Sequence, residues 1–202
     1  MGLISNGTTI FDAGAMSLGG SLVFIKKLTA SSSATLSFVD GASGVVLDDT
    51  YKEYYFTFNN MHPATNDADF QFNISVDGGS NYNVTKTSTM FRAYHRENDG
   101  GAALEYDAGF DLAQSTAFQS IVQEIGNEND ECASGTLHLF NPSSTTFVKH
   151  FTSTFNMTLH WDVQMAMYGA GYGNTTSAVD AIQFKMNTGN IDAGDICLYG
   201  IA

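Results

Sequence analysis

The chain is poor in positive charge and in proline, and both shortages exclude classes of protein. Its 202 residues hold eight Lys and Arg against 21 Asp and Glu, a formal net charge of −13. A chain this acidic repels phosphate backbones and anionic membranes, so we expect neither nucleic acid nor a membrane as its partner. Only two Pro occur, and 43% of the residues are hydrophobic, which argues against disorder.

Cysteine is equally scarce. Cys132 and Cys197 are the only two, and neither stands in the spacing of a metal site. Small disulfide-dependent proteins carry more cysteines in shorter chains, so we expect two reduced thiols in a product made in the cytoplasm. A disulfide between the two stays open at this point.

Long apolar runs and catalytic motifs are missing as well. No run of about 18 apolar residues could span a membrane, and residues 1–10 lack the basic and apolar segments of a signal peptide. There is no Gly-x-Ser-x-Gly elbow, P-loop or dinucleotide fingerprint. The five His are scattered without zinc-site spacing. The sequence therefore predicts no cofactor, no metal and no enzymatic activity.

What the chain does contain is short stretches that alternate apolar and polar residues. Residues 70–76 and 156–165 alternate most clearly, which predicts half-buried strands. The Asp-Gly-Gly sequence at 77–79 predicts a hairpin after the first of these. The Gly-rich residues 168–174 are expected to form a loop. Residues 181–186 and 195–201 are predicted to form a buried strand pair joined by a Gly- and Asn-rich corner.

About nine to eleven such strands can be counted, and no segment predicts a long helix; residues 113–125 fit a strand as well as a helix. We therefore expect an all-β protein, an antiparallel β-sandwich of jelly-roll-like type. Residues 22–202 are predicted to form this single domain. Residues 1–21 are expected to be a flexible N-terminal arm with a short strand near residues 8–11.

Three stretches carry a resemblance to a known family: YKEYYFTFNNMHPATNDADFQFNISVDGGSNY at 51–82, SGTLHLFNPSSTTFVKH at 134–150, and SAVDAIQFKMNTGNIDAGDICLYGIA at 177–202. In this order and spacing they resemble a single-domain structural protein of tailed bacteriophage virions, including those of marine phages. The resemblance implies a jelly-roll-like β-sandwich without catalytic residues. It implies a non-enzymatic building block of the virion, as a capsid decoration or in the tail or collar, made in the host cytoplasm.

The same resemblance implies that the partners are further copies of this chain and other virion proteins. A homo-oligomer would also cover the unpaired strand edges of a sandwich. Trimers are common around virus symmetry axes, so a trimer is one expected form.

Two groups of residues could carry chemistry. The first, an imidazole beside a cation and carboxylates, would make an acid/base group but has the composition of a solvated turn: His95, Arg96, Glu97 and Asp99. The second could offer oxygen ligands to Ca²⁺ but has the composition of an exposed acidic loop: Glu124, Glu128, Asp130 and Glu131. We favour the structural interpretation of both.

Aromatic residues near the Gly-rich segment suggest an alternative function. Trp161, Tyr168, Tyr172 and Asn174 could form a platform on which a host surface glycan stacks, because aromatic faces and amides suit sugars. The alternative is thus a receptor- or glycan-binding module of a tail fibre. The structural interpretation is a hydrophobic plug at the mouth of the sandwich.

Overall fold

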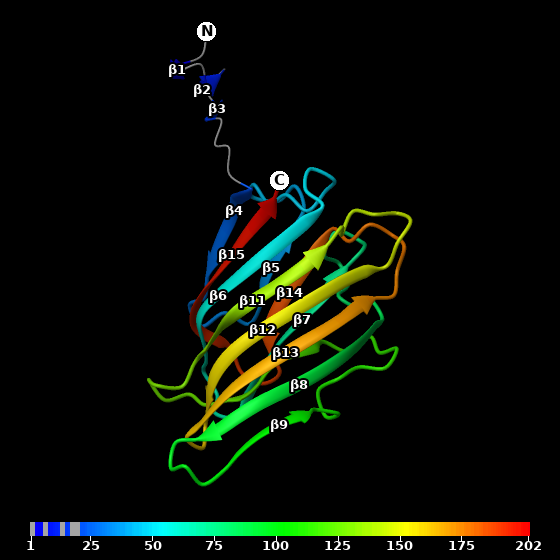
Figure 1. Ribbon diagram of the computed structural model, residues 1–202. Coiled ribbons are helices and arrows are strands. Elements are labelled where there is room, and N and C mark those ends of the chain that lie inside the picture. Colours follow the sequence, from blue (N-terminus) through cyan, green and yellow to red (C-terminus); the bar gives the residue numbers. More distant parts are fainter. Residues whose placement is uncertain (1–2, 6–7, 13–14, 17–20) are drawn as a thin grey trace.

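The computed structural model describes residues 3–5, 8–12, 15–16 and 21–202, and its regular elements are all strands (Figure 1). Three short ones, β1 (Leu3–Ser5), β2 (Thr8–Asp12) and β3 (Ala15–Met16), pair only with one another. β2 covers the short strand predicted near residues 8–11. The flexibility expected of the arm concerns residues of which some lie outside the described ranges, and it stays a prediction. Within those ranges, no helix is long and apolar enough to cross a membrane.

The other twelve strands form two layers with antiparallel pairing throughout. Their bounds are β4 (Leu22–Thr29), β5 (Leu36–Val39), β6 (Glu53–Pro63), β7 (Ala68–Ser75), β8 (Lys86–Arg96), β9 (Ala102–Tyr106), β10 (Gln119–Ile125), β11 (Ala133–Phe140), β12 (Lys149–Leu159), β13 (Val163–Gly173), β14 (Ala181–Met186) and β15 (Ile191–Ile201). The large sheet has the order β4-β15-β6-β11-β12-β13-β8-β9, and the small sheet β10-β7-β14-β5. A single pair, Ile125 with Leu159, joins the two.

Eight of these strands have the pairing of a jelly roll. β4 pairs with β15, β5 with β14, β6 with β11 and β7 with β10. In chain order this joins the first of the eight with the last, the second with the seventh, and so on inward. Such nested pairing is a long hairpin rolled into two sheets, which defines the jelly roll. The predicted fold class is confirmed, and the twelve strands slightly exceed the expected count.

The remaining four strands are two insertions into this core. β8 and β9 follow β7, and β12 and β13 follow β11. They lie side by side beyond β11 and widen the large sheet at one side (Figure 1). We call these four strands the extension.

The core between the layers is built from phenylalanines, with Phe184 of β14 at its centre. Its ring lies 5.1 Å from that of Phe58 and 5.6 Å from that of Phe56, both on the large sheet. On its own sheet it stacks on Phe70 at 5.8 Å. All four rings are fully buried. Contacts between aromatic residues of this kind stabilise beyond the burial of their area.

Two predicted partnerships are wrong. β14 and β15 match the last two predicted strands, but they do not pair with each other, because β14 lies in the small sheet and β15 in the large one. β7 and β8, on either side of Asp77, likewise lie in different sheets and form no hairpin. Gly78 and Gly79 do adopt positive φ, of 70° and 77°. They reverse the chain as expected, but a reversal does not decide which strand becomes the partner.

The predicted loop at residues 168–174 is instead the second half of β13. Gly169, Gly171 and Gly173 recur with the strand period of two on the face toward the interior. A Cβ on Gly171 would lie 2.5 Å from the Thr87 carbonyl oxygen, and one on Gly173 would lie 2.7 Å from Ile74. The glycines therefore allow close packing within a strand.

The stretch predicted as one strand at residues 156–165 contains a hairpin turn. β12 ends at Leu159, β13 begins at Val163, and these two residues face each other. The turn between them has no glycine, and Asp162 takes the left-handed φ of 60°. Because three turn residues leave the alternation in phase, the pattern continues through the turn and hides it.

Candidate functional site

Residues on the outer face of the extension are aligned in rows by the strand register. Residues directly opposite each other on neighbouring strands point to the same face. Across β8, β13 and β12 the register gives three consecutive rows: Thr87, Tyr172 and His150; Thr89, Ala170 and Thr152; Phe91, Tyr168 and Thr154. Two aromatic rows thus flank one made of small residues.

The first two rows line an open groove of about 330 Å³, which we call the outer groove. Ala170 is the smallest side chain at its floor, between the hydroxyls of Thr89 and Thr152. On the far side of this floor, the rings of Phe91 and Tyr168 stack 4.9 Å apart at 10°. The two side chains are 45% and 37% exposed, so the stacked pair presents part of its apolar surface to solvent.

Tyr172 is held in place by a residue that sequence reasoning did not single out. The amide nitrogen of Gln114 donates to the Tyr172 hydroxyl over 3.3 Å and to Thr87 Oγ1 over 2.7 Å. Asn174 in turn donates to Gln114 Oε1 over 2.8 Å. Of the predicted glycan contacts, Tyr168 and Tyr172 therefore share one face, and Asn174 is connected to Tyr172 through Gln114.

Trp161, the fourth predicted glycan contact, lies apart from these. It occupies the turn between β12 and β13, where its ring stacks on His160 at 5.6 Å and 10° and the Arg96 guanidinium lies 5.4 Å from its centre. With Arg96, Tyr94 and Val163 it borders a cavity of about 90 Å³ on the inner face of the extension. The structure therefore divides the predicted platform between two faces.

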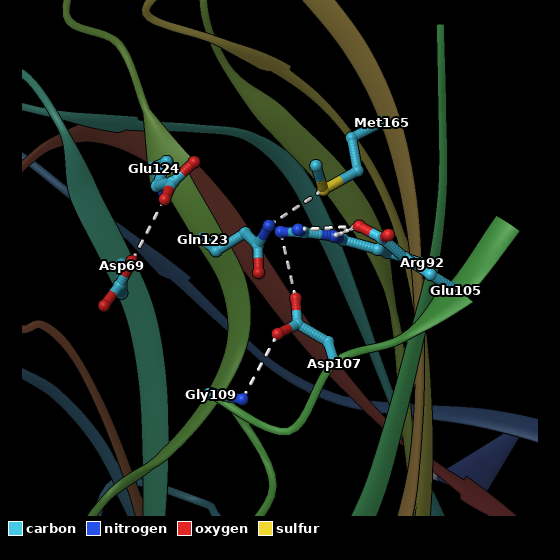
Figure 2. Close-up of polar contacts among 8 residues, drawn as sticks. All are labelled: Asp69, Arg92, Glu105, Asp107, Gly109, Gln123, Glu124 and Met165. Atoms are coloured by element: carbon cyan, nitrogen blue, oxygen red, sulfur yellow. Dashed lines mark hydrogen bonds and ion pairs between the residues drawn. The ribbon is translucent and has the colours of Figure 1, made fainter. Parts of the chain in front are cut away.

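The closest cluster of charged groups lies on that inner face (Figure 2). Arg92 of β8 contacts Glu105 Oε1 at 2.8 Å and Asp107 Oδ2 at 3.0 Å. Asp107 is buried, and Gln123 of β10 completes the cluster when its amide nitrogen donates to Asp107 Oδ2 over 2.8 Å. One guanidinium thus engages both carboxylates, and Gln123 connects the cluster to the core.

Asp69, also in Figure 2, supports an irregular part of the small sheet. Its Oδ1 accepts a hydrogen bond of 3.0 Å from the backbone nitrogen of Glu124, where φ is 53° and the pairing of β10 with β7 is interrupted. Its Oδ2 accepts from Asn187 over 2.9 Å. Burial raises the pKa of the Asp69 carboxyl above its usual value. This carboxylate stabilises a bulge.

The residues considered for acid/base chemistry are not brought into a pocket together. His95 and Asp99 form an exposed pair at 3.0 Å in the turn after β8. Arg96 points to the other face, toward Trp161. Glu97 follows the end of β8, and its backbone nitrogen bonds to the Asp162 carbonyl.

The acidic residues considered for calcium are likewise divided. Glu131 is buried against Gly126 and accepts a hydrogen bond from the Glu128 backbone over 2.8 Å, while Asp130 is exposed. Among the residues that the structure describes, no three His, Cys, Asp or Glu converge as a metal site would require.

The two cysteines are unpaired. Burial raises the pKa of the Cys132 thiol, which opposes formation of a reactive thiolate. Nearby, His62 has Glu128 O on one ring nitrogen at 3.1 Å and Asp192 on the other at 3.7 Å. The imidazole therefore faces a carbonyl oxygen and a carboxylate.

Two fully buried lysines share one row of the inner face, and no sequence pattern predicts their burial. Lys86 of β8 and Lys149 of β12 flank Gly173. Lys86 Nζ donates to Asn73 Oδ1 and to the Val84 carbonyl, and burial lowers its pKa to about 7. Lys149 Nζ donates to three carbonyl oxygens, and burial lowers its pKa too.

Comparison of the sequence with protein-family models and with curated proteins finds no match. The function must therefore be argued from the residues themselves.

Proposed function

We propose that this chain is a non-enzymatic structural protein of a tailed bacteriophage virion, a capsid decoration or a tail or collar building block. The observation that supports the proposal is where the three resembling stretches fall. Residues 51–82 hold β6 and β7, residues 134–150 most of β11, and residues 177–202 β14 and β15. These are all jelly-roll strands, so the resemblance concerns the scaffold, and jelly rolls recur in viral capsid domains.

In this role the chain assembles with copies of itself, a trimer being one expected form, and with neighbouring virion proteins. Mass spectrometry of purified particles tests the proposal, because a structural component must be present in a fixed copy number. Absence from purified virions would contradict it. Light scattering of the isolated protein gives its oligomeric state, and an image of the particle separates a capsid from a tail location.

A second candidate function is a receptor- or glycan-binding module of a tail fibre. The exposed Tyr168 and the half-buried Tyr172 on one face of β13 support it, since aromatic faces beside amides suit sugar rings. A glycan array probed with the assembled protein tests it. Binding that Tyr172→Ala weakens is the expected result, and no binding on any glycan would contradict it.

A further inference from the structure

The outer groove has a lining that suits one class of ligand. All its lining residues lie within the described part of the chain, and none is Asp, Glu, Lys or Arg. In a chain of net charge −13, a groove without a cation offers nothing to attract an anion. Without a carboxylate in its lining it offers no partner to a cation either, so the groove suits a neutral ligand.

The groove is also amphipathic, with hydroxyl groups along its floor and aromatic rings on both sides. Thr87, Thr89 and Thr152 present hydroxyls that both donate and accept, and the hydroxyl of Tyr172 keeps its own proton free to donate while it accepts from Gln114. The rings of Tyr172 and His150 stand along one side, and the stacked pair of Phe91 and Tyr168 lies along the other. Closely spaced hydroxyls beside apolar ring faces complement a sugar ring, which has hydroxyls at its rim and C–H groups on its faces.

The dimensions agree with a saccharide that lies across the strands. The two aromatic rows are four residues of β13 apart, about 13 Å along the strand, which leaves room for a ring over the Ala170 row. That row spans three strands, about 10 Å, and continues onto β11, where His138 faces Thr152. The volume of about 330 Å³ is at the lower end of small-molecule sites, roughly 300–1,000 Å³.

We infer that the outer groove binds a neutral saccharide chain, with Ala170 as its floor and with Tyr172, held by Gln114, as its principal wall. This inference rests on the second candidate function and is independent of the virion proposal. Ala170 determines access, because a large side chain such as tyrosine at this position would project into the groove. Since Ala170 is exposed, such a substitution changes the groove without disturbing the core.

Native gel electrophoresis in the presence of polysaccharide tests the inference on the full chain, whose charge carries it into the gel. The probes are neutral dextran, galactomannan and xyloglucan, with anionic alginate as the contrast. Ala170→Tyr and Thr152→Arg block the floor of the groove. Ala166→Tyr is the matched control, because it lies on the same face of β13 but one row beyond Tyr168, beside Asn156 and Ala93. Circular dichroism checks that each variant keeps its fold.

We expect at least one neutral polysaccharide to retard the wild-type protein, and alginate not to. The dissociation constant rises at least tenfold in Ala170→Tyr and in Thr152→Arg and changes less than twofold in Ala166→Tyr. If both blocking variants are still retarded, or if alginate alone retards the wild type, the protein binds glycans but the outer groove is not a site for neutral saccharides. The inference is then wrong, while the second candidate function stands. No retardation in any gel overturns the inference together with the second candidate function.

Discussion

Replacing Lys86 with methionine tests whether a buried amine in this sandwich is neutral at physiological pH. The Lys86 side chain is fully buried, and no carboxylate among the described residues pairs with it. Its two acceptors, Asn73 Oδ1 and the Val84 carbonyl, match the two N–H groups of a neutral amine. Methionine has a similar length and carries no charge, so the variant removes the ionisation and keeps most of the packing.

The sign of the pH dependence follows from the lowered pKa. Between about pH 7 and the ordinary pKa of 10.5, the unfolded chain holds a proton on Lys86 that the folded chain lacks. The free energy of unfolding therefore rises with pH in this window and is independent of Lys86 below it. At about 1.4 kcal/mol per pH unit, wild type gains about 3 kcal/mol between pH 6 and pH 9 relative to Lys86→Met.

Urea unfolding followed by circular dichroism, in reductant and at each pH unit from 6 to 9, measures both proteins. The series stops at pH 9 because burial, with the nearby Asp48 charge, raises the pKa of Tyr54, and ionisation of this tyrosine in the unfolded chain lowers stability at higher pH. Lys149→Met is the matched control, since three carbonyl acceptors suit an ammonium group, and a smaller change is expected. Parallel curves for wild type and Lys86→Met would refute the reasoning.

Three further substitutions probe the packing. Arg92→Met leaves the buried Asp107 without its cation and is expected to cost about 3 kcal/mol of unfolding free energy, measured by urea unfolding. Phe184→Ala opens a cavity at the centre of the aromatic core and is expected to cost 3–5 kcal/mol by the same measurement, roughly the range for buried Phe. Gly171→Ala places a Cβ 2.5 Å from a carbonyl oxygen and lowers the melting temperature, whereas Gly109→Ala, with 3.5 Å to its nearest atom, leaves it nearly unchanged.

The first two of these have an exposed counterpart that should change little. Glu105→Gln alters the more exposed partner of Arg92, at 41%, and is expected to cost less than about 1 kcal/mol. Phe24→Ala removes a ring that is 58% exposed, so it should cost far less than Phe184→Ala. If either counterpart destabilised the protein as much as its buried partner, the assignment of the core would be wrong.

The strands themselves could be predicted from the sequence because burial of one face imposes a period of two, as in residues 70–76. Which strands become neighbours could not be predicted. The pattern of β14 and β15 is the same whether they pair with each other or lie in opposite sheets, and only the nested pairing with β5 and β4 decides it. The turn before β13 was missed because no Gly or Pro marks it.

The candidate site shows the same division. Tyr168 and Tyr172 could be picked out as candidate contacts, since they stand out in the composition of one segment. That they point to the same face could be predicted only by treating the segment as a strand, in which the glycines between them alternate with residues of the opposite face. Gln114 could not be found, because it lies in an irregular segment and comes close to Tyr172 only through folding. Trp161 was predicted on the wrong face because it lies in the turn between β12 and β13, which no Gly or Pro marks.

The outer groove lies on the extension and not on the eight jelly-roll strands. The eight jelly-roll strands enclose the phenylalanine core, whereas the extension comes from two insertions. Its inner face packs through Arg92, Met165 and the buried lysines. On its outer face Gln114 contacts Thr87 and Tyr172, whereas Phe91 and Tyr168 are exposed beside the groove. The stacked pair of Phe91 and Tyr168 stabilises the pairing of β8 with β13, and the exposed faces of the same rings are the surface that the proposed saccharide binding would use.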